Sequence, residues 1–329
     1  ATASIFPALM YYISILLAVD AMAVKHNIKG LDKDQLPSMK EVMKKRGAMA
    51  IPIVILVGLI CYGYSPMKSA VFSLISVLIC ACFNKETRPT FKKIQKALES
   101  GSKSVVPIVS TCACAGIIVG VLSITGLGAK LSYSLIYLAH DNIYIGALIT
   151  ALITILLGCG MPAAAVYVVL ASILAPSLIK MGAEPLAAHM FIFFFSCIGT
   201  ITPPVAITSY TAAAIAEADA NKTGWKAFRL GIVAFIIPFI FLTSPALIMI
   251  GSKLEVFIAM LTAVVGIFCL VGAFEGYMIF SYGKVARILL GVASICTIIP
   301  GTTTDVIGIV LIAVAIVLTL IINKKRVAA

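Results

Sequence analysis

The sequence predicts an all-α polytopic membrane protein with a re-entrant helical hairpin and an unwound transmembrane helix. It is 61% hydrophobic and 12% charged, with a mean hydropathy of +1.12, whereas ordinary soluble domains contain roughly 25% charged residues. Apolar runs recur between short polar loops, and many approach the roughly 20 residues that a membrane-spanning helix needs. Two clusters of glycine and proline interrupt the most apolar runs. In hydrocarbon, such breaks survive only where protein or a bound ligand satisfies the freed peptide groups.

The unbroken apolar segments are expected to span the membrane near 5–24, 48–63, 66–83, 105–124, 230–250, 255–272, 286–300 and 306–322. Segment 127–139 is ambiguous, because it also suits an element along the outer surface. In 84–104, Phe91, Ile94 and Leu98 recur at helical spacing. This pattern favours an amphipathic helix at the membrane interface, and a solvated loop is the alternative.

The positions of the basic residues define the orientation. The net charge is +12, and 21 of the 25 Lys and Arg fall on one face, in 25–46, 84–104, 217–229, 273–287 and 323–326. Such a bias is typical of cytoplasmic loops, so we expect a cytoplasmic C-terminus. Because cytoplasmic loops account for most of the positive charge, the charge does not indicate a nucleic-acid partner.

The first break is Gly158-Cys159-Gly160-Met161-Pro162, in a stretch without formal charge. Its flanking arms, 143–157 and 163–179, measure roughly 22–26 Å at about 1.5 Å per residue, against a hydrocarbon core of about 30 Å. Two short arms indicate a re-entrant hairpin over 143–179. Pro162 suits the first turn of the returning helix, where its missing N–H is not needed.

The second break covers Gly199 to Pro204 within a segment, 186–216, that we expect to cross the membrane. We predict a half-helix over 186–198, unwound chain over 199–204 and a second half-helix over 205–216. Pro203 and Pro204 prevent the first half from continuing and would start the second. Kinks that only improve packing are the alternative for both breaks, since Gly and Pro are frequent in transmembrane helices.

The broken ends supply opposite partial charges. Free carbonyls end the arms 143–157 and 186–198. Together with the hydroxyls of Ser196, Thr200 and Thr202, they can bind a hard cation such as Na⁺. The returning arms begin with free N–H groups, which can hold a carboxylate without any Lys or Arg. Tyr167, Thr208 and Tyr210 are close enough in sequence to orient such an anion.

The other polar side chains do not indicate a catalytic or metal site. His189 is compatible with a proton relay or with a hydrogen-bonded interior histidine. The nine cysteines lie in or beside apolar segments, and we interpret them as packing residues because no His or acid accompanies the Cys-x-Cys pairs. No paired intramembrane carboxylates, His clusters or serine nucleophile motifs indicate an enzyme, and no organic cofactor is expected.

Three motifs carry a family resemblance: Gly158–Pro162 (GCGMP), Ser196–Val205 (SCIGTITPPV) and Asn221–Leu230 (NKTGWKAFRL). In this order, they make the chain resemble the large membrane subunit of tripartite ATP-independent periplasmic (TRAP) transporters, above all the fused type, and specifically its C-terminal half. The resemblance implies a sodium-driven elevator permease in a bacterial inner membrane. It also implies import of carboxylates delivered by a periplasmic binding protein.

The resemblance assigns roles by position. The outward hairpin tip and the facing unwound loop would bind Na⁺ through Gly158, Cys159, Gly160, Met161, Ser196, Gly199, Thr200, Thr202 and Pro203. The solute would contact Pro162, Ala163, Tyr167, Pro204, Thr208 and Tyr210. The implied organisation is scaffold-type helices over 1–104, a transport-type module over 105–229 and C-terminal helices over 230–329.

The sequence also departs from the family pattern. It has no second hairpin with a small, hydroxyl-rich tip, no second Pro-Pro break and no small-subunit helices. We therefore expect either a fragment or a half-transporter that pairs with another chain. A channel-like or scaffold-only membrane subunit without ion coupling is the alternative function.

Overall fold

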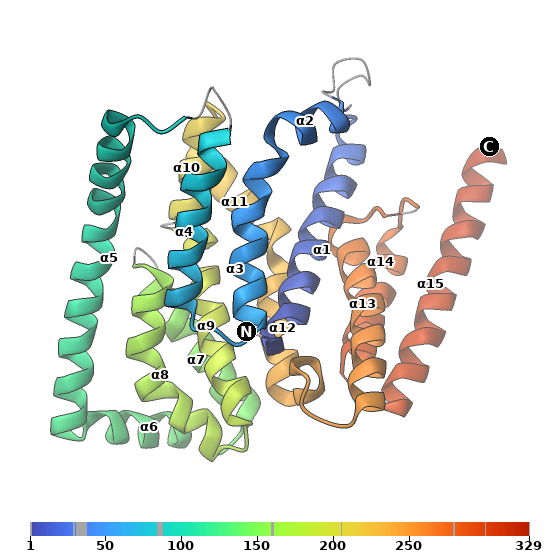
Figure 1. The fold of residues 1–329 in the computed structure, drawn as a ribbon. Helices are drawn as coiled ribbons and strands as arrows, with labels where there is room; N and C mark the ends of the chain where they lie inside the picture. The colour runs from blue at the N-terminus through green and yellow to red at the C-terminus, as the bar shows by residue number, and fades with distance from the viewer. Residues whose placement is uncertain are drawn as a thin grey trace. The chain divides into compact units, whose positions relative to one another are not determined.

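The computed structural model describes residues 2–28, 30, 38–83, 88–158, 161–204, 206–278, 280–299 and 301–328. Over these residues the chain is helical, and the only β-type pairing is an isolated bridge between Tyr277 and Ser281. The expected all-α class is therefore confirmed. The elements in Figure 1 are α1 (Thr2–Lys25), α2 (Met39–Arg46), η2 (Gly47–Ala50), α3 (Ile51–Cys61), α4 (Pro66–Phe83), α5 (Phe91–Thr125), α6 (Leu127–Leu138), α7 (Ile143–Gly158), α8 (Ala163–Lys180), α9 (Pro185–Ile198), η3 (Gly199–Ile201), α10 (Ile207–Ile215), α11 (Ala220–Leu230), α12 (Ile232–Thr243), η4 (Pro245–Ile248), α13 (Lys253–Glu275), α14 (Lys284–Ile298) and α15 (Thr302–Ala328).

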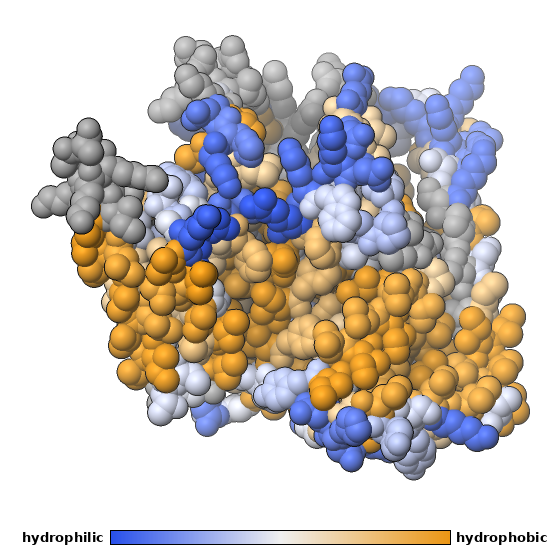
Figure 2. Space-filling model, turned by 180° about the vertical axis from the view of Figure 1, so that it is seen from behind, coloured by the Kyte–Doolittle hydropathy of each residue, from blue (hydrophilic) through white to orange (hydrophobic). Residues whose placement is uncertain are grey.

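The helices have the length and composition of a polytopic membrane protein. Within the described residues, 5 helices are long and apolar enough to cross a membrane, or up to 6 if the bent pair α5–α6 forms one span. Shorter apolar helices include Ile143–Gly158 and Pro185–Ile201, the elements that lead into the two breaks. Figure 2 shows orange hydrophobic side chains in a broad band, with blue hydrophilic side chains along its edges. The chain is therefore a multi-pass membrane protein.

The chain forms two compact units. The first comprises Ala1–Thr2 and Lys29–Pro107, and the second comprises Ala3–Ile28 and Ile108–Ala329. In the first unit α3 packs on α4, and the Ser73 hydroxyl of α4 donates a hydrogen bond to the Pro52 carbonyl of α3 at 2.9 Å. The α1 helix belongs to the second unit, so the expected division into 1–104, 105–229 and 230–329 stays a prediction.

The chain turns sharply between α5 and α6. Gly126 has a φ of +67°, a left-handed conformation that glycine adopts without steric penalty. The axis of α6 makes 82° with the preceding segment Cys112–Thr125. This crosswise direction fits the expected alternative of an element along the membrane surface. Residues 91–104 are helical as expected, but they continue into the 105–124 segment as one helix.

Helix α9 is the element that connects the two breaks in the second unit. It packs against both hairpin arms, α7 and α8, and also against α12. The contact with α12 is aromatic, because Phe191 and Phe195 of α9 meet Phe239 of α12 at centroid distances of 5.2 and 5.6 Å. Phe191 and Phe195 are almost completely buried. This packing fixes the helix that carries the second break against the hairpin that carries the first.

Candidate ion and solute site

The first break separates two apolar helices. The helix α7 ends at Gly158 and α8 begins at Ala163, with 16 and 18 residues respectively. Pro162 lies immediately before α8, not in its first turn, and its carbonyl accepts the N–H groups of Ala165 and Val166. Cys159 and Gly160 lie outside the described residues. The two helices and the break agree with the expected arms, and the re-entrant path through a membrane stays a prediction.

The second break begins later than expected. Residues Gly199–Ile201 continue α9 as the 3₁₀ helix η3, and the chain becomes irregular from Thr202. Pro203 and Pro204 do not start the next helix, because Ala206 follows in a left-handed conformation with a φ of +32° and α10 begins at Ile207. The Tyr210 hydroxyl donates to the Pro204 carbonyl, so the irregular chain is tied to the helix that follows it.

The two breaks meet at glycines. A Cβ atom placed on Gly199 would lie 3.1 Å from Gly158 Cα and 3.2 Å from the Gly158 carbonyl carbon. Both residues are buried. Their approach brings the carboxyl end of α7 against the carboxyl end of α9, so two negative helix ends converge. The Gly158 and Ser196 carbonyl oxygens lie beside this contact, at 3.4 Å and 3.6 Å from the Cβ positions of Gly199 and Gly158.

Three hydroxyls follow the same stretch of α9 and η3. Ser196 donates to the Ile192 carbonyl at 2.7 Å, Thr200 to Cys197 at 2.8 Å, and Thr202 to Ile198 at 2.9 Å. Ser196 and Thr202 are buried. Because each hydroxyl proton is used on the backbone, the oxygen lone pairs remain available as acceptors or ligands. The region therefore offers neutral oxygen ligands near two helix carboxyl ends.

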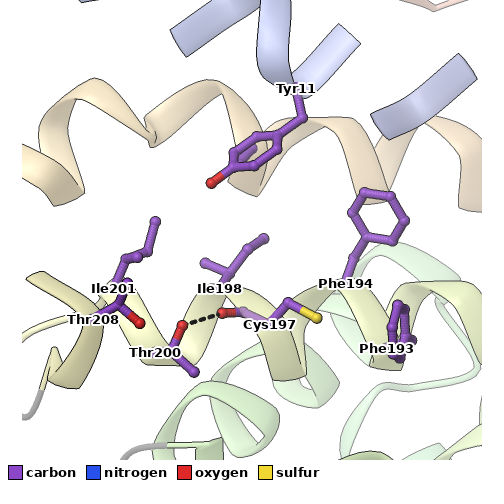
Figure 3. Close-up of a pocket in the computed structure, with 9 residues that line it drawn as sticks. Tyr11, Phe193, Phe194, Cys197, Ile198, Thr200, Ile201 and Thr208 are labelled. Carbon is purple, nitrogen blue, oxygen red and sulfur yellow. Dashed lines mark hydrogen bonds between the residues drawn. The ribbon is translucent and has the colours of Figure 1, made fainter. Parts of the chain in front are cut away.

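A cavity of about 280 Å³ borders this segment and is lined by α1, α9, η3, α10 and α12. Figure 3 shows Tyr11 reaching from α1 over Cys197, Ile198 and Ile201. The lining is mostly apolar, with polar groups from Tyr11, Cys197, Thr200 and Thr208. Thr208 lies in the first turn of α10, where backbone N–H groups lack helical acceptors. The Thr200 proton is already used on Cys197, so the donors that the cavity can offer an anion are the Tyr11 and Thr208 hydroxyls, beside the amino end of α10.

The predicted solute residues are only partly brought together. Thr208 lines the cavity, whereas the Tyr210 hydroxyl is engaged by Pro204 and Asn221. Tyr167 does not line it. Its hydroxyl is 3.1 Å from His189 Nδ1, and its ring meets the cavity residue Phe193 edge-on at 5.7 Å. His189 is thus hydrogen-bonded, as one of its two expected interpretations requires. The remaining predicted solute residues, Pro162, Ala163 and Pro204, lie at the two breaks and outside the cavity lining.

Sequence reasoning did not include several residues that form the cavity wall, namely Tyr11, Phe193, Phe194, Cys197, Ile198, Ile201 and Ala234. Most occupy apolar helices, where hydropathy does not distinguish a cavity wall from a packed core. Tyr11 carried the clearest signal, as a phenolic hydroxyl within an apolar span. Ser209 was also missed. Its buried hydroxyl has no hydrogen-bond partner among the described residues.

Paired helix breaks inside a helical membrane protein are typical of secondary transporters, in which such breaks hold the substrate and ion. Residues 1–256 match the family described as "Tripartite ATP-independent periplasmic transporter, DctM component". The match covers well over half of the chain. The chain therefore belongs to the DctM family of TRAP transporter permease components, as its three motifs indicated.

A curated relative supports the same assignment. The chain is 25% identical over 191 residues to the isethionate TRAP transporter permease protein DctMQ of Oleidesulfovibrio alaskensis. The alignment covers 58% of this chain and 30% of that protein, so the chain spans well under half of the relative's length. No solved structure matches the chain.

Proposed function

We propose that the chain is part of a sodium-coupled permease and that Na⁺ binds where Gly158 meets Gly199. The observation that carries this proposal is the convergence of two helix carboxyl ends on that contact. Each end carries a partial negative charge of about half an elementary charge. No carboxylate is needed to attract a cation there. The Gly158 and Ser196 carbonyls, with the Ser196 and Thr202 hydroxyls, are the hard oxygen donors that such a cation takes in place of water.

The transported solute is proposed to be a small organic anion bound in the cavity. Thr208 places the amino end of α10 at the cavity, and this end favours negative charge. The related permease is named for isethionate, a sulfonate, and a carboxylate presents a similar set of acceptor oxygens. We infer a carboxylate-type solute for this chain, with a sulfonate as the competing chemistry.

The proposed assembly contains more than this chain. It includes a periplasmic binding protein that delivers the solute, the other half of the large membrane domain and the small membrane subunit, in one polypeptide or several. The basic loops would face the cytoplasm of a bacterial inner membrane, with the C-terminus on the same side. This assignment rests on family membership and on the charge bias of the loops.

The ion proposal is tested by thermal unfolding of the intact permease, purified with its partner chains, in matched NaCl, KCl and choline chloride. We expect stabilisation by Na⁺ alone, about 1.4 kcal/mol at ten times its Kd. Thr202→Val removes the hydroxyl at constant shape and should abolish the Na⁺ response. Thr202→Ser keeps the hydroxyl and should retain the response.

Equal unfolding in the three salts would contradict sodium binding and favour a channel-like or scaffold-only subunit.

The class of the transported solute is tested separately. The permease is reconstituted into proteoliposomes, the periplasmic binding protein is added on the outside, and solute uptake is measured. We expect an inward Na⁺ gradient to drive uptake of a labelled small carboxylate. Uptake of a sulfonate alone would replace the carboxylate assignment.

A further inference from the structure

A second hollow lies away from the breaks, between α12 and α14, with α13 as its floor. Its volume is about 650 Å³, and its walls are mostly apolar. The lining side chains include Ile236, Leu270, Phe274, Ile288, Val292 and Ile295. Three of these lie on α14 at helical spacing and are exposed in the structure, Ile288 by 68%, Val292 by 47% and Ile295 by 54%. We refer to this hollow as the α12–α14 groove.

One end of the α12–α14 groove is basic. Lys284 and Arg287 line it at the start of α14. Arg287 donates to the Ala273 and Phe274 carbonyls at 2.8 Å, which fixes its guanidinium at the carboxyl end of α13. Arg229 also reaches the Phe274 carbonyl, at 3.4 Å. Two arginines therefore meet at the Phe274 carbonyl, and one of them, Arg287, lines the basic end of the groove.

Among the described residues, no carboxylate pairs with the two cations that line the groove. Within the described part of the chain, neither Lys284 nor Arg287 forms an ion pair, and Glu275 is the one carboxylate in contact with the cluster. Glu275 pairs with Arg229, at 3.5 Å. An anion at the basic end of the groove would therefore meet two cations without acidic partners.

The length of the groove matches half of a bilayer. Ile295 follows Lys284 by 11 residues on the same helix, which is about 16 Å at 1.5 Å per residue. The hydrocarbon core is about 30 Å thick, so one leaflet measures about 15 Å. A lipid with its phosphate at Lys284 and Arg287 would have its acyl chain beside Ile288, Val292 and Ile295 for the depth of its own leaflet.

We propose that the α12–α14 groove is a binding site for one anionic phospholipid, whose phosphate is held by Lys284 and Arg287. Basic pockets between transmembrane helices at the cytoplasmic level suit such headgroups. A spanning helix of another subunit would need an apolar surface across the whole core, about 30 Å. The part of the groove that lies on α14, from Lys284 to Ile295, is only about 16 Å long. The geometry therefore favours a lipid.

The experiment is native mass spectrometry of the intact permease from mixed micelles with equal amounts of chain-matched phosphatidylglycerol and phosphatidylcholine. We expect preferential retention of one phosphatidylglycerol. Lys284→Gln should raise the Kd for phosphatidylglycerol about fivefold, the effect of one lysine near a charged headgroup, and so lower its occupancy. Lys253→Gln is the matched control, because Lys253 is exposed at the opposite end of α13. It should leave the occupancy unchanged.

The apolar part of the site is tested by two valine substitutions, one inside the groove and one outside it. Val292→Phe fills the groove and should reduce retention of both lipids at this site, whereas Val265→Phe, on an exposed part of α13 outside the groove, should not. Equal retention of the two lipids by the wild type would overturn the proposal. Unchanged phosphatidylglycerol occupancy in both Lys284→Gln and Val292→Phe would also overturn it. A crosslink from Val292→Cys to another protein chain would assign the groove to a subunit instead.

Discussion

Gly158 and Gly199 meet backbone to backbone, although 40 residues lie between them in the sequence. The Cβ position of Gly199 is 3.1 Å from Gly158 Cα, whereas the Cβ position of Gly158 is 3.5 Å from Gly199 Cα. The contact is therefore asymmetric. A methyl group on Gly199 would crowd the backbone of Gly158, which would have to shift by a few tenths of an ångström, whereas one on Gly158 would make ordinary van der Waals contact.

This asymmetry predicts different effects of two similar substitutions. Gly199→Ala should destabilise the permease by about 1–3 kcal/mol, because overpacking must move backbone, and should weaken the response to Na⁺. Gly158→Ala should have a smaller effect on both. The measurement is thermal unfolding with and without Na⁺. Gly120→Ala, with nothing within 4 Å of its Cβ position, is the control. Equal effects of Gly158→Ala and Gly199→Ala would contradict the proposed geometry.

The sequence was informative about the fold because hydrophobic runs and helix breakers act locally. The α4 helix covers the predicted 66–83 segment, and α7 ends one residue beyond the predicted arm 143–157. Local pattern does not specify which helices pack together. It therefore did not predict that α1 joins the unit containing α9, or that α5 continues through Ser104 into the next segment.

In the candidate site, too, local features could be predicted from the sequence, whereas features that depend on long-range packing could not. Glycines and prolines marked both breaks, and the structure brings the breaks into contact. The start of α10 was harder to predict, since it depends on the left-handed conformation of Ala206, a residue type that gives no local signal for it. Tyr11 was not predicted because its place in the cavity wall depends on the long-range packing of α1 near α9.

The hydrogen bond between Tyr167 and His189 should stabilise the pairing of α8 with α9. Tyr167→Phe removes the hydroxyl and keeps the edge-on ring contact with Phe193, so we expect a loss of about 1 kcal/mol of unfolding free energy. A double-mutant cycle with His189→Gln should give a coupling of at least about 0.5 kcal/mol. Denaturant or thermal unfolding of the four proteins measures both the loss and the coupling energy.

The same variants distinguish a structural His189 from a proton relay. For a structural histidine, solute uptake by His189→Gln should keep the pH profile of the wild type, measured in proteoliposomes at a fixed Na⁺ gradient. A flattened profile with unchanged stability would instead assign proton transfer to His189.

Cys197 provides a native reporter of the cavity. Its side chain lines the cavity and is exposed in the structure. In a variant that keeps Cys197 as its only cysteine, a small methanethiosulfonate reagent should label this thiol. A transported anion should slow the labelling several-fold by occupying the same space. Cys296, which lies on α14 outside the cavity, serves as the control in a second single-cysteine variant. Equal labelling rates with and without solute at Cys197 would contradict the assignment of the cavity.

The ion pair of Arg229 and Glu275 should couple α11 to the carboxyl end of α13. The Glu275 side chain is 4% exposed and that of Arg229 is 55% exposed, at a separation of 3.5 Å. Removing only the arginine leaves a buried carboxylate without its ion-pair partner. We therefore expect Arg229→Gln to lower stability by about 1–3 kcal/mol and Glu275→Gln to lower it less.

The double variant Arg229→Gln, Glu275→Gln separates charge pairing from packing. It should be more stable than Arg229→Gln alone, because it contains no unpaired buried charge. Because Arg229 is partly exposed, the coupling should weaken as salt rises from 0.01 M to about 1 M, where the screening length falls to about 3 Å. Thermal unfolding of the four proteins across this salt range gives the coupling. Strict additivity at low salt would contradict an energetic coupling between Arg229 and Glu275.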